Sequence, residues 1–306
     1  MHIPDGFLDT KTWVTAAAAS GAVLAYAVRK ANAEMEEKDA PLMGVTAAFI
    51  FAAQMLNFPV AGGTSGHFIG GALAAILLGP WKAMLTMLSV VTVQALLFGD
   101  GGVSTLGANT LNMAIIAPFV AHAMYAVLRR FGASIGAFAA GLVSTMVTAL
   151  ACAVELAASG TAPLLLTTAL MGGWHLLIGV GEGVITATTV GFLLKVRPDM
   201  VQGRGGVDWR SLTALAGVAV FCALLVSPLA SSLPDGLERV AHSVGFSDRA
   251  FGLYRALIPD YAVPGFRSEG LATGLAGLVG VVLAVATGFG IAALTRRRPT
   301  REHKVK

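Results

Sequence analysis

The chain has 306 residues, of which 56% are hydrophobic and 12% are charged, and its formal net charge is +4. Soluble domains carry roughly 25% charged residues. Half that share, with apolar runs along the chain, excludes a soluble globular protein and indicates an integral membrane protein. The small positive charge does not indicate a nucleic-acid partner. The two cysteines, Cys152 and Cys222, lie inside apolar runs and are interpreted as packing residues.

The first nine residues, MHIPDGFLD, are polar and turn-forming. Asp5 and Asp9 precede the first apolar run and Lys11 abuts it, which differs from the charged start of a cleavable signal peptide. We therefore expect this segment to stay on the mature protein. Met1 should be retained as well, because methionine removal generally needs a small second residue and His2 is large. Residues 4–6 are expected to form a turn that holds the terminus in place.

Nine apolar stretches follow, and a spanning helix needs about 20 apolar residues. The third stretch is short, and the seventh is too long and glycine-rich for one straight helix. We expect a broken helix there, followed by a full span. The sequence thus predicts an all-α polytopic membrane protein. The stretches are 12–28, 41–58, 68–80, 82–98, 111–128, 134–158, 164–196, 212–230 and 270–294, and the seventh contains Gly172, Gly173, Gly179, Gly181 and Gly183.

The basic residues predict the orientation, because Lys and Arg concentrate on the cytoplasmic side. With the N-terminus outside and nine crossings, the inside segments hold all but five of the 21 Lys and Arg. The C-terminus is then cytoplasmic, and the chain is a multi-pass protein of the cell (inner) membrane. The loop that carries His67 falls on the same outer side as His2. The five outside residues are Lys11, Arg239, Arg249, Arg255 and Arg267.

A polar, basic and Gly-rich seam at 198–211 divides the chain into two predicted modules. Residues 1–197 form a bundle of about seven helices, and the seam is interpreted as a cytoplasmic linker. Residues 212–306 form a module with two spans within 212–295 and an extracytoplasmic segment at 231–268. His242 in that segment is interpreted as an exposed loop residue, although it could also pass a metal ion along.

A free N-terminus followed by histidine is a chelator. The amine of Met1, the amide nitrogen of His2 and the imidazole Nδ1 of His2 can close two rings around one ion in a plane. A second imidazole can fill the open corner, and His67 lies on the same predicted side. Planar nitrogen coordination favours Ni(II) or Cu(II) over Zn(II) or Mg(II). The alternative is that His2 is an ordinary exposed terminal residue and His67 an ordinary loop histidine, and that neither binds a metal ion.

Further polar residues on the outer side are candidates for supporting this site. Thr64 and Ser65 could orient the imidazole of His67. Polar groups at membrane depth are costly in lipid, so those of residues 94–113 should face protein or a water-filled cavity. Loop and cap chemistry is an equally good explanation for each of them alone. The candidates in that stretch are Gln94, Asp100, Asn109 and Asn112.

Two ionisable residues occur in the glycine-rich seventh stretch. His175 and Glu182 are seven residues apart, on one face of a continuous helix. They could form an ion path or proton relay, or a structural contact. Glu155 and His122 are isolated and are interpreted as structural or interfacial.

Four motifs in order resemble the CbiM/NikM family of substrate-capture membrane subunits of energy-coupling-factor transporters for nickel and cobalt. They are MHIPDGFLD, GGTSGHFIGG, FGDGGVSTLGANTLNMA and IGVGEGVIT, within residues 1–196. LPDGLE at 233–238 resembles a PDGLE-type small subunit fused to such proteins. The resemblance implies a seven-helix bundle with the N-terminal segment inserted from outside. It also implies a metal ion held by Met1, His2 and His67, with a membrane coupling subunit and cytoplasmic ATPase subunits as partners.

The sequence agrees that ATP is hydrolysed elsewhere, because it contains no Walker A pattern and no Gly-Lys dipeptide. We therefore expect a non-enzymatic capture component whose transported substrate is Ni²⁺ or Co²⁺, with a lean towards Ni²⁺ and no organic cofactor. The alternative is a self-sufficient secondary transporter or channel, which would need a continuous path of ionisable residues. A membrane metalloprotease is disfavoured because no HExxH motif occurs.

Overall fold

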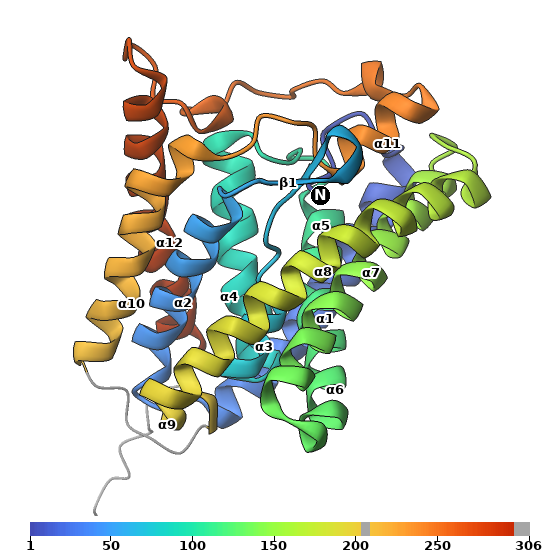
Figure 1. Ribbon diagram of the computed structural model, residues 1–306. Helices are drawn as coiled ribbons and strands as arrows, with labels where there is room; N and C mark the ends of the chain where they lie inside the picture. Colours follow the sequence, from blue (N-terminus) through green and yellow to red (C-terminus); the bar gives the residue numbers. More distant parts are fainter. Residues whose placement is uncertain (203–208, 297–306) are drawn as a thin grey trace, which may run out of the picture.

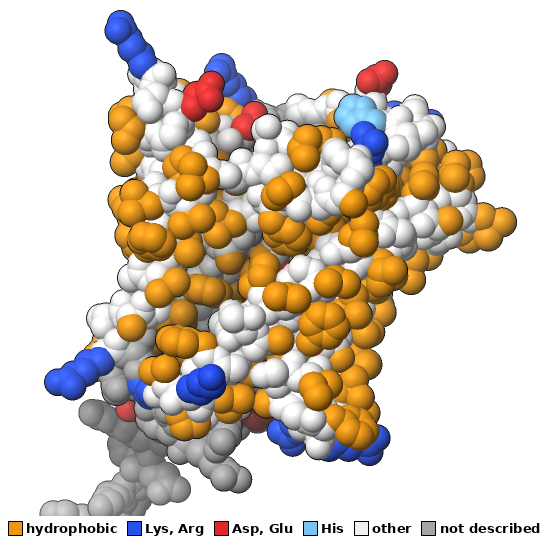
Figure 2. Space-filling view, viewed as in Figure 1, with side chains coloured by type: hydrophobic (Ala, Val, Ile, Leu, Met, Phe, Trp, Pro, Cys, Tyr) orange, Lys and Arg blue, Asp and Glu red, His pale blue; other side chains and the backbone are white. Residues whose placement is uncertain are grey.

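The computed structural model describes residues 1–202 and 209–296 and is built almost entirely of helices (Figure 1). Six helical segments among these residues are long and apolar enough to cross a membrane. The prediction of an all-α polytopic membrane fold is confirmed. Hydrophobic side chains cover the middle of the face in Figure 2, with Lys and Arg at its upper and lower margins. The six segments are Pro80–Phe98, Leu106–Phe131, Ala133–Ala158, Leu164–Val196, Leu212–Leu229 and Glu269–Thr295.

Two further helices occupy the first two predicted spans. α1 (Thr10–Glu34) begins at Asp9, whose carboxylate accepts a hydrogen bond from the N–H of Thr12 at 3.0 Å. It has the length to cross a membrane but is less apolar than the six. α2 (Asp39–Gln54) has 16 residues, nearly all buried. It lies between α4, α10 and α12, so its short length is shielded by protein (Figure 1).

The third predicted span is only partly a helix, because residues 68–70 are extended and the expectation of a helix over 68–80 is wrong there. A small antiparallel hairpin, β1 (Phe58–Val60), η1 (Ala61–Gly63) and β2 (Thr64–Gly66), precedes an extended segment. α3 (Gly71–Leu78) then has eight residues, or about 12 Å at 1.5 Å per residue. That is less than half of a hydrocarbon core of about 30 Å.

Side chains satisfy the extended backbone that replaces the missing helical turns. The carboxylate of Glu182 accepts from the N–H groups of Ile69 at 2.7 Å and Gly70 at 3.0 Å. The amide of Gln54 donates to the carbonyl of Ile69 at 2.6 Å. Non-helical backbone at membrane depth is tolerated only where protein or water pairs its polar groups. Glu182 and Gln54 therefore make the broken third crossing possible.

The seventh stretch forms one continuous helix, α8 (Leu164–Val196), so the expectation of a broken helix is wrong. Its glycines serve close packing against α7 (Ala133–Ala158). A Cβ added at Gly183 would lie 2.8 Å from the carbonyl oxygen of Phe138, and one at Gly179 would lie 3.1 Å from that of Leu142. Small residues that let backbones approach are a regular feature of membrane helix pairs.

The second part of the chain packs on the first. α10 (Trp209–Phe221) and α12 (Glu269–Thr295) lie beside α2 (Figure 1). The segment between them crosses over the end of the bundle where the N-terminus lies. Of the predicted linker, residues 198–202 form α9 (Pro198–Gln202), and residues 203–208 lie outside the described part. The segment between α10 and α12 contains η5 (Cys222–Val226), η6 (Ser227–Leu229), α11 (Gly236–Val244), η7 (Ser247–Arg249) and η8 (Pro259–Tyr261).

The helices around residues 94–116 contain two π-helical stretches, η2 (Gln94–Phe98) and η3 (Thr110–Ile116). Such stretches are rare and often occur at functional sites. They flank the loop 99–105, against which the N-terminal segment lies. The remaining helices of this region are α4 (Pro80–Val93), α5 (Leu106–Asn109), α6 (Ala117–Leu128) and η4 (Arg129–Phe131).

Candidate metal centre

The N-terminal segment is inserted into the protein. The side chain of Ile3 is fully buried, and Met1 is only 4% exposed. The N–H of Ile3 donates to Oδ1 of Asn109 at 2.8 Å. Its carbonyl accepts from Nδ2 of Asn109 at 3.0 Å, the hydroxyl of Thr105 at 2.6 Å and the N–H of Gly102 at 2.9 Å. These bonds fix the backbone directly after the first two residues.

The glycines of the loop 99–105 make room for this segment. A Cβ at Gly102 would lie 2.3 Å from the backbone nitrogen of Asp5. Gly101 has a φ of +87°, and a Cβ there would approach the Cβ of His2 at 3.2 Å. The carboxylate of Asp5 in turn accepts from the N–H of Ser104 at 2.8 Å and from its hydroxyl at 2.5 Å. The GDGG sequence is therefore the cradle of the N-terminal segment.

The three predicted ligand residues meet at the end of this cradle. The amine of Met1 contacts Nε2 of His67. The rings of His2 and His67 are stacked, with centroids 5.5 Å apart and an angle of 15° between the planes. His67 follows β2 directly, so the hairpin delivers it to the terminus. The structure brings an amine and two imidazoles, all nitrogen donors, into one cluster.

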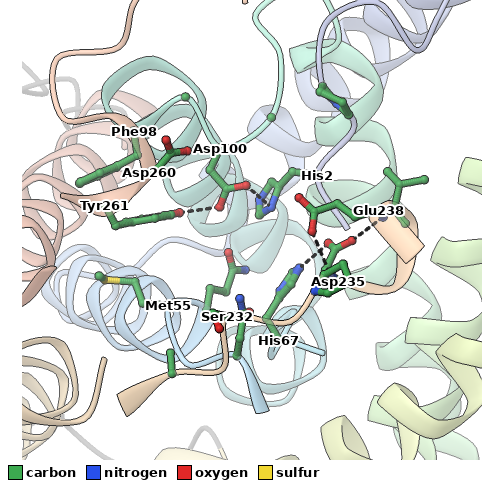
Figure 3. A pocket seen from close by; sticks show the side chains of 18 of the residues that line it. His2, Met55, His67, Phe98, Asp100, Ser232, Asp235, Glu238, Asp260 and Tyr261 are labelled. Carbon is green, nitrogen blue, oxygen red and sulfur yellow. Dashed lines mark hydrogen bonds and ion pairs between the residues drawn. The ribbon is translucent and has the colours of Figure 1, made fainter. Parts of the chain in front are cut away.

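Oxygen groups surround His2. Its Nδ1 lies 2.9 Å from Oδ1 of Asp100, and its Nε2 lies 3.0 Å from Oε1 of Gln94. Gln94 donates onward to Oε1 of Gln54 at 2.6 Å. The hydroxyl of Tyr261 donates to the other oxygen of Asp100 at 2.6 Å, so Asp100 lies between His2 and Tyr261 (Figure 3). Asp100 thus links Nδ1 of His2 to the hydroxyl of Tyr261.

Burial and charge set the protonation of the cluster. Burial, assisted by the nearby terminal amine, lowers the pKa of His67 from 6.5 to about 3, which keeps the imidazole neutral at pH 7. Burial alone would raise the pKa of Asp235, but the terminal amine and His67 outweigh it and hold that pKa below its usual range. The pKa of Asp100 is lowered in the same way by His2 against the effect of burial. At neutral pH the imidazole of His67 is therefore neutral, with the carboxylates of Asp100 and Asp235 nearby.

The hydroxyls of Thr64 and Ser65 do not orient the imidazole of His67 as expected. The hydroxyl of Ser65 donates to the carbonyl of Leu233 at 2.7 Å, and its N–H donates to the carbonyl of Pro234 at 2.9 Å. Thr64 is buried, and its hydroxyl has no hydrogen-bond partner among the described residues. Because the hairpin lies against the loop 231–235, Ser65 faces that loop instead of the histidine ring.

Three other candidates have hydrogen-bond partners of their own, although His175 lines a small pocket together with Met1, His67 and Asp235. Asn112 donates to the carboxylate of Glu155 at 2.7 Å, between η3 and α7. Nδ1 of His175 bonds the carbonyl of Met171 at 2.8 Å, within α8. Glu182 holds the start of α3. His175 and Glu182 thus have separate partners, and the structure gives each a local role in place of the suggested relay.

Sequence reasoning missed Asp235 as a site residue. Its Oδ2 lies 2.6 Å from the amine of Met1 and 3.8 Å from Nε2 of His67. The LPDGLE motif that contains it was noticed, but nothing in a sequence pattern joins it to a residue 234 positions away. Gln54 and Tyr261 were missed for the same reason. Among the described residues, no group of three or more His, Cys, Asp or Glu side chains is arranged to hold a metal ion.

A cavity of about 1010 Å³ opens beside the cluster. His2, His67 and Asp100 line it from the first part of the chain, and the segment 227–273 lines the other side. Figure 3 shows the side chains of His2, His67, Asp235 and Glu238 gathered in this pocket. The cluster is therefore next to a space large enough for a hydrated ion.

The chain was compared with known proteins. Residues 2–200 match the family model of the cobalt uptake substrate-specific transmembrane region. This chain is a member of that family. Residues 209–297 match the model of the PDGLE domain.

The similar proteins agree with this membership of the cobalt-uptake family. A putative fused nickel transport protein NikMN of Archaeoglobus fulgidus is 40% identical over 97% of this chain and 98% of its own length. The fused nickel transport protein NikMN of Rhodobacter capsulatus is 33% identical over 97% and 99%. A crystal structure of a truncated transition metal transporter matches with a TM-score of 0.59 and 38% identity, over 64% of this chain and 99% of that one. The chain is thus a multi-pass membrane component of the metal-transport type.

Proposed function

We propose that this chain is the substrate-binding membrane component of an ATP-driven energy-coupling-factor importer for Ni²⁺ or Co²⁺. The supporting observation is that the amine of Met1, the imidazole of His67 and His2 gather beside a polar cavity. In this proposal the transported ion is bound by the amine of Met1, the amide nitrogen and Nδ1 of His2, and Nε2 of His67. Residues 1–197 carry the site, and residues 212–295 form an accessory membrane module.

The donor set decides which ions are favoured. Three nitrogens of one chelate lie in a plane, and a fourth from His67 completes a square. Such a set favours Ni(II), which is why we propose nickel ahead of cobalt; the relatives named for nickel transport point the same way. Nδ1 of His2 faces Asp100 in the structure, so loading requires the ring to turn away from that carboxylate.

The buried ionisable groups support a coupled importer over a self-sufficient transporter. Glu182 is engaged with the backbone at α3, Glu155 with Asn112, and His175 with its own helix. Among the described residues, no hydrogen bond or ion pair joins these three groups to one another. We therefore propose that a membrane coupling subunit and separate ATPase subunits drive release, with the N-terminus extracytoplasmic and the C-terminus cytoplasmic.

Equilibrium binding of Ni(II) to the purified full chain tests the site. We expect one ion per chain, and His67→Gln should weaken binding by at least about tenfold. His122→Gln is a matched control, because His122 is exposed on α6 away from the cluster. A chain extended by two residues ahead of Met1 should also bind weakly, since its amine is displaced. Equal affinity of the extended chain and the wild type would overturn the proposed site.

Coupling is tested separately by metal uptake. Cells that make this chain alone, without the partner ATPase subunits, should not accumulate Ni²⁺. Accumulation by the chain alone would favour the secondary transporter.

A further inference from the structure

The second module reaches directly into the proposed metal site. Asp235 precedes α11, and its Oδ2 lies 2.6 Å from the amine of Met1, with both side chains largely buried. It is also 3.8 Å from Nε2 of His67. A carboxylate of one module therefore holds the group that the other module offers as a ligand. Asp235 is not one of the metal ligands proposed above, and a role for it in metal binding rests on that proposed function.

Asp235 is held in place from both sides. The carbonyl of Pro234 accepts from the N–H of Ser65, which fixes the loop to the hairpin that carries His67. On the other side, Oδ1 of Asp235 accepts from the N–H of Glu238 at 2.9 Å, and Glu238 accepts from the N–H of Asp235 at 2.9 Å. This reciprocal capping box fixes the start of α11. Oδ1 thus serves the helix and Oδ2 serves the amine.

The same segment is tied to the loops around the N-terminus at three more points. The N–H of Ser231 donates to the carbonyl of Asn57 at 2.8 Å. The N–H of Phe251 donates to the carbonyl of Asp5 at 3.0 Å, and that of Ile258 to the carbonyl of Leu97 at 3.0 Å. The position of Asp235 relative to Met1 therefore follows from the docking of the whole segment.

The contact between Asp235 and the amine of Met1 can form in both the metal-free and the metal-bound site. Without metal, the carboxylate pairs with the charged terminus and keeps it beside His67. A coordinated primary amine still carries N–H groups, so Asp235 can accept a hydrogen bond from the metal-bound terminus as well. Partners of this kind orient ligands, and their loss typically weakens metal binding about 10- to 100-fold.

We propose that Asp235 is a positioning residue of the metal site, through which the second module completes the site built on the first. It holds the terminal amine in the place where the amine and Nε2 of His67 can bind the same ion. The second module thus contributes a residue to the metal-binding site.

Asp235→Asn in the full chain tests this role. Asn caps helices about as well as Asp, so α11 keeps its cap while the amine loses its ion-pair partner. We expect Ni(II) affinity to fall by about tenfold or more, and the visible d–d absorption of planar Ni(II) to appear at correspondingly higher metal concentration. Asp248→Asn is the matched control, because it removes the same charge from an exposed position of the same segment. Its affinity should equal that of the wild type.

The conservative variant Asp235→Glu keeps the charge and should restore part of the lost affinity, which a role in folding alone does not predict. If Asp235→Asn does not fold, Asp235→Ser takes its place, because Ser also caps helices but has no carboxylate for the amine; wild-type affinity in Asp235→Ser then overturns the proposal. Wild-type affinity in Asp235→Asn also overturns it, while binding that still depends on His67 leaves the proposed function standing. An equal loss in Asp248→Asn would show general electrostatic attraction and would contradict the proposal too.

Discussion

Asn109→Ala tests how much the two backbone groups of Ile3, its N–H and its carbonyl, each contribute to the proposed site. The variant removes the acceptor of the N–H of Ile3, which has no other hydrogen bond among the described contacts of that segment. Leaving a buried N–H unpaired costs about 1–3 kcal/mol. The carbonyl of Ile3 also loses a donor, the side-chain amide of Asn109. It keeps Thr105 and Gly102 as donors, so this second loss adds little to the free-energy cost. If that cost falls on the inserted terminus, Ni(II) affinity drops about 5- to 150-fold.

Thr105→Val is the matched comparison. It removes one of three donors to the carbonyl of Ile3 and leaves the N–H of Ile3 paired, so affinity should stay within about threefold of the wild type. Isothermal titration of the purified full chain with Ni(II) measures both variants. An equal effect of Asn109→Ala and Thr105→Val, or no effect of either, would refute the argument that Ile3 anchors the terminal ligands.

Three other predictions concern the cradle, the broken crossing and pH. Gly102→Ala should lower Ni(II) affinity by about tenfold or more, because its Cβ would lie 2.3 Å from the nitrogen of Asp5. The control Gly21→Ala, in open space on α1, should leave the affinity unchanged. Equal affinities of the two variants in a titration would contradict the role of the loop 99–105 in holding the N-terminal segment. Glu182→Ala should destabilise the protein by about 2–6 kcal/mol, since it leaves two buried N–H groups unpaired; an unchanged thermal unfolding midpoint in detergent would be inconsistent with that role. The lowered pKa of His67, about 3 against 6.5, means that its neutral form gives full stability above pH 6.5 and less as pH falls towards 3. The unfolding midpoint of the metal-free wild type should therefore fall more steeply over this range than that of His67→Gln, and parallel curves would argue against a buried neutral imidazole.

The apolar runs predicted the membrane fold because hydrophobic length alone decides whether a helix can cross. They failed at residues 68–70, where a carboxylate from α8 accepts the hydrogen bonds of an extended backbone, and no local signal reports a partner 112 or 113 residues away. They also failed in α8, since glycine lowers helix propensity in isolation but allows close packing in a bundle. Both errors have the same origin, which is tertiary contact overriding a local preference.

The cluster of Met1, His2 and His67 could be anticipated because the chelating chemistry of a terminal histidine is local and the positive-inside rule brought His67 to the same side. The partners of that cluster could not. Asp235 and Tyr261 reach the site only because α10 and α12 dock against α2 and carry the intervening segment over the N-terminus. The expected roles of Thr64 and Ser65 were assigned from nearness in sequence to His67, whereas the hairpin turns Ser65 towards the loop of the second module.

Nickel X-ray absorption of the loaded full chain tests the central claim most directly. A planar set of four nitrogen donors, lost when two residues are added ahead of Met1, is the result we predict. A six-coordinate, oxygen-rich spectrum that is the same in both chains would contradict a site built on the N-terminus.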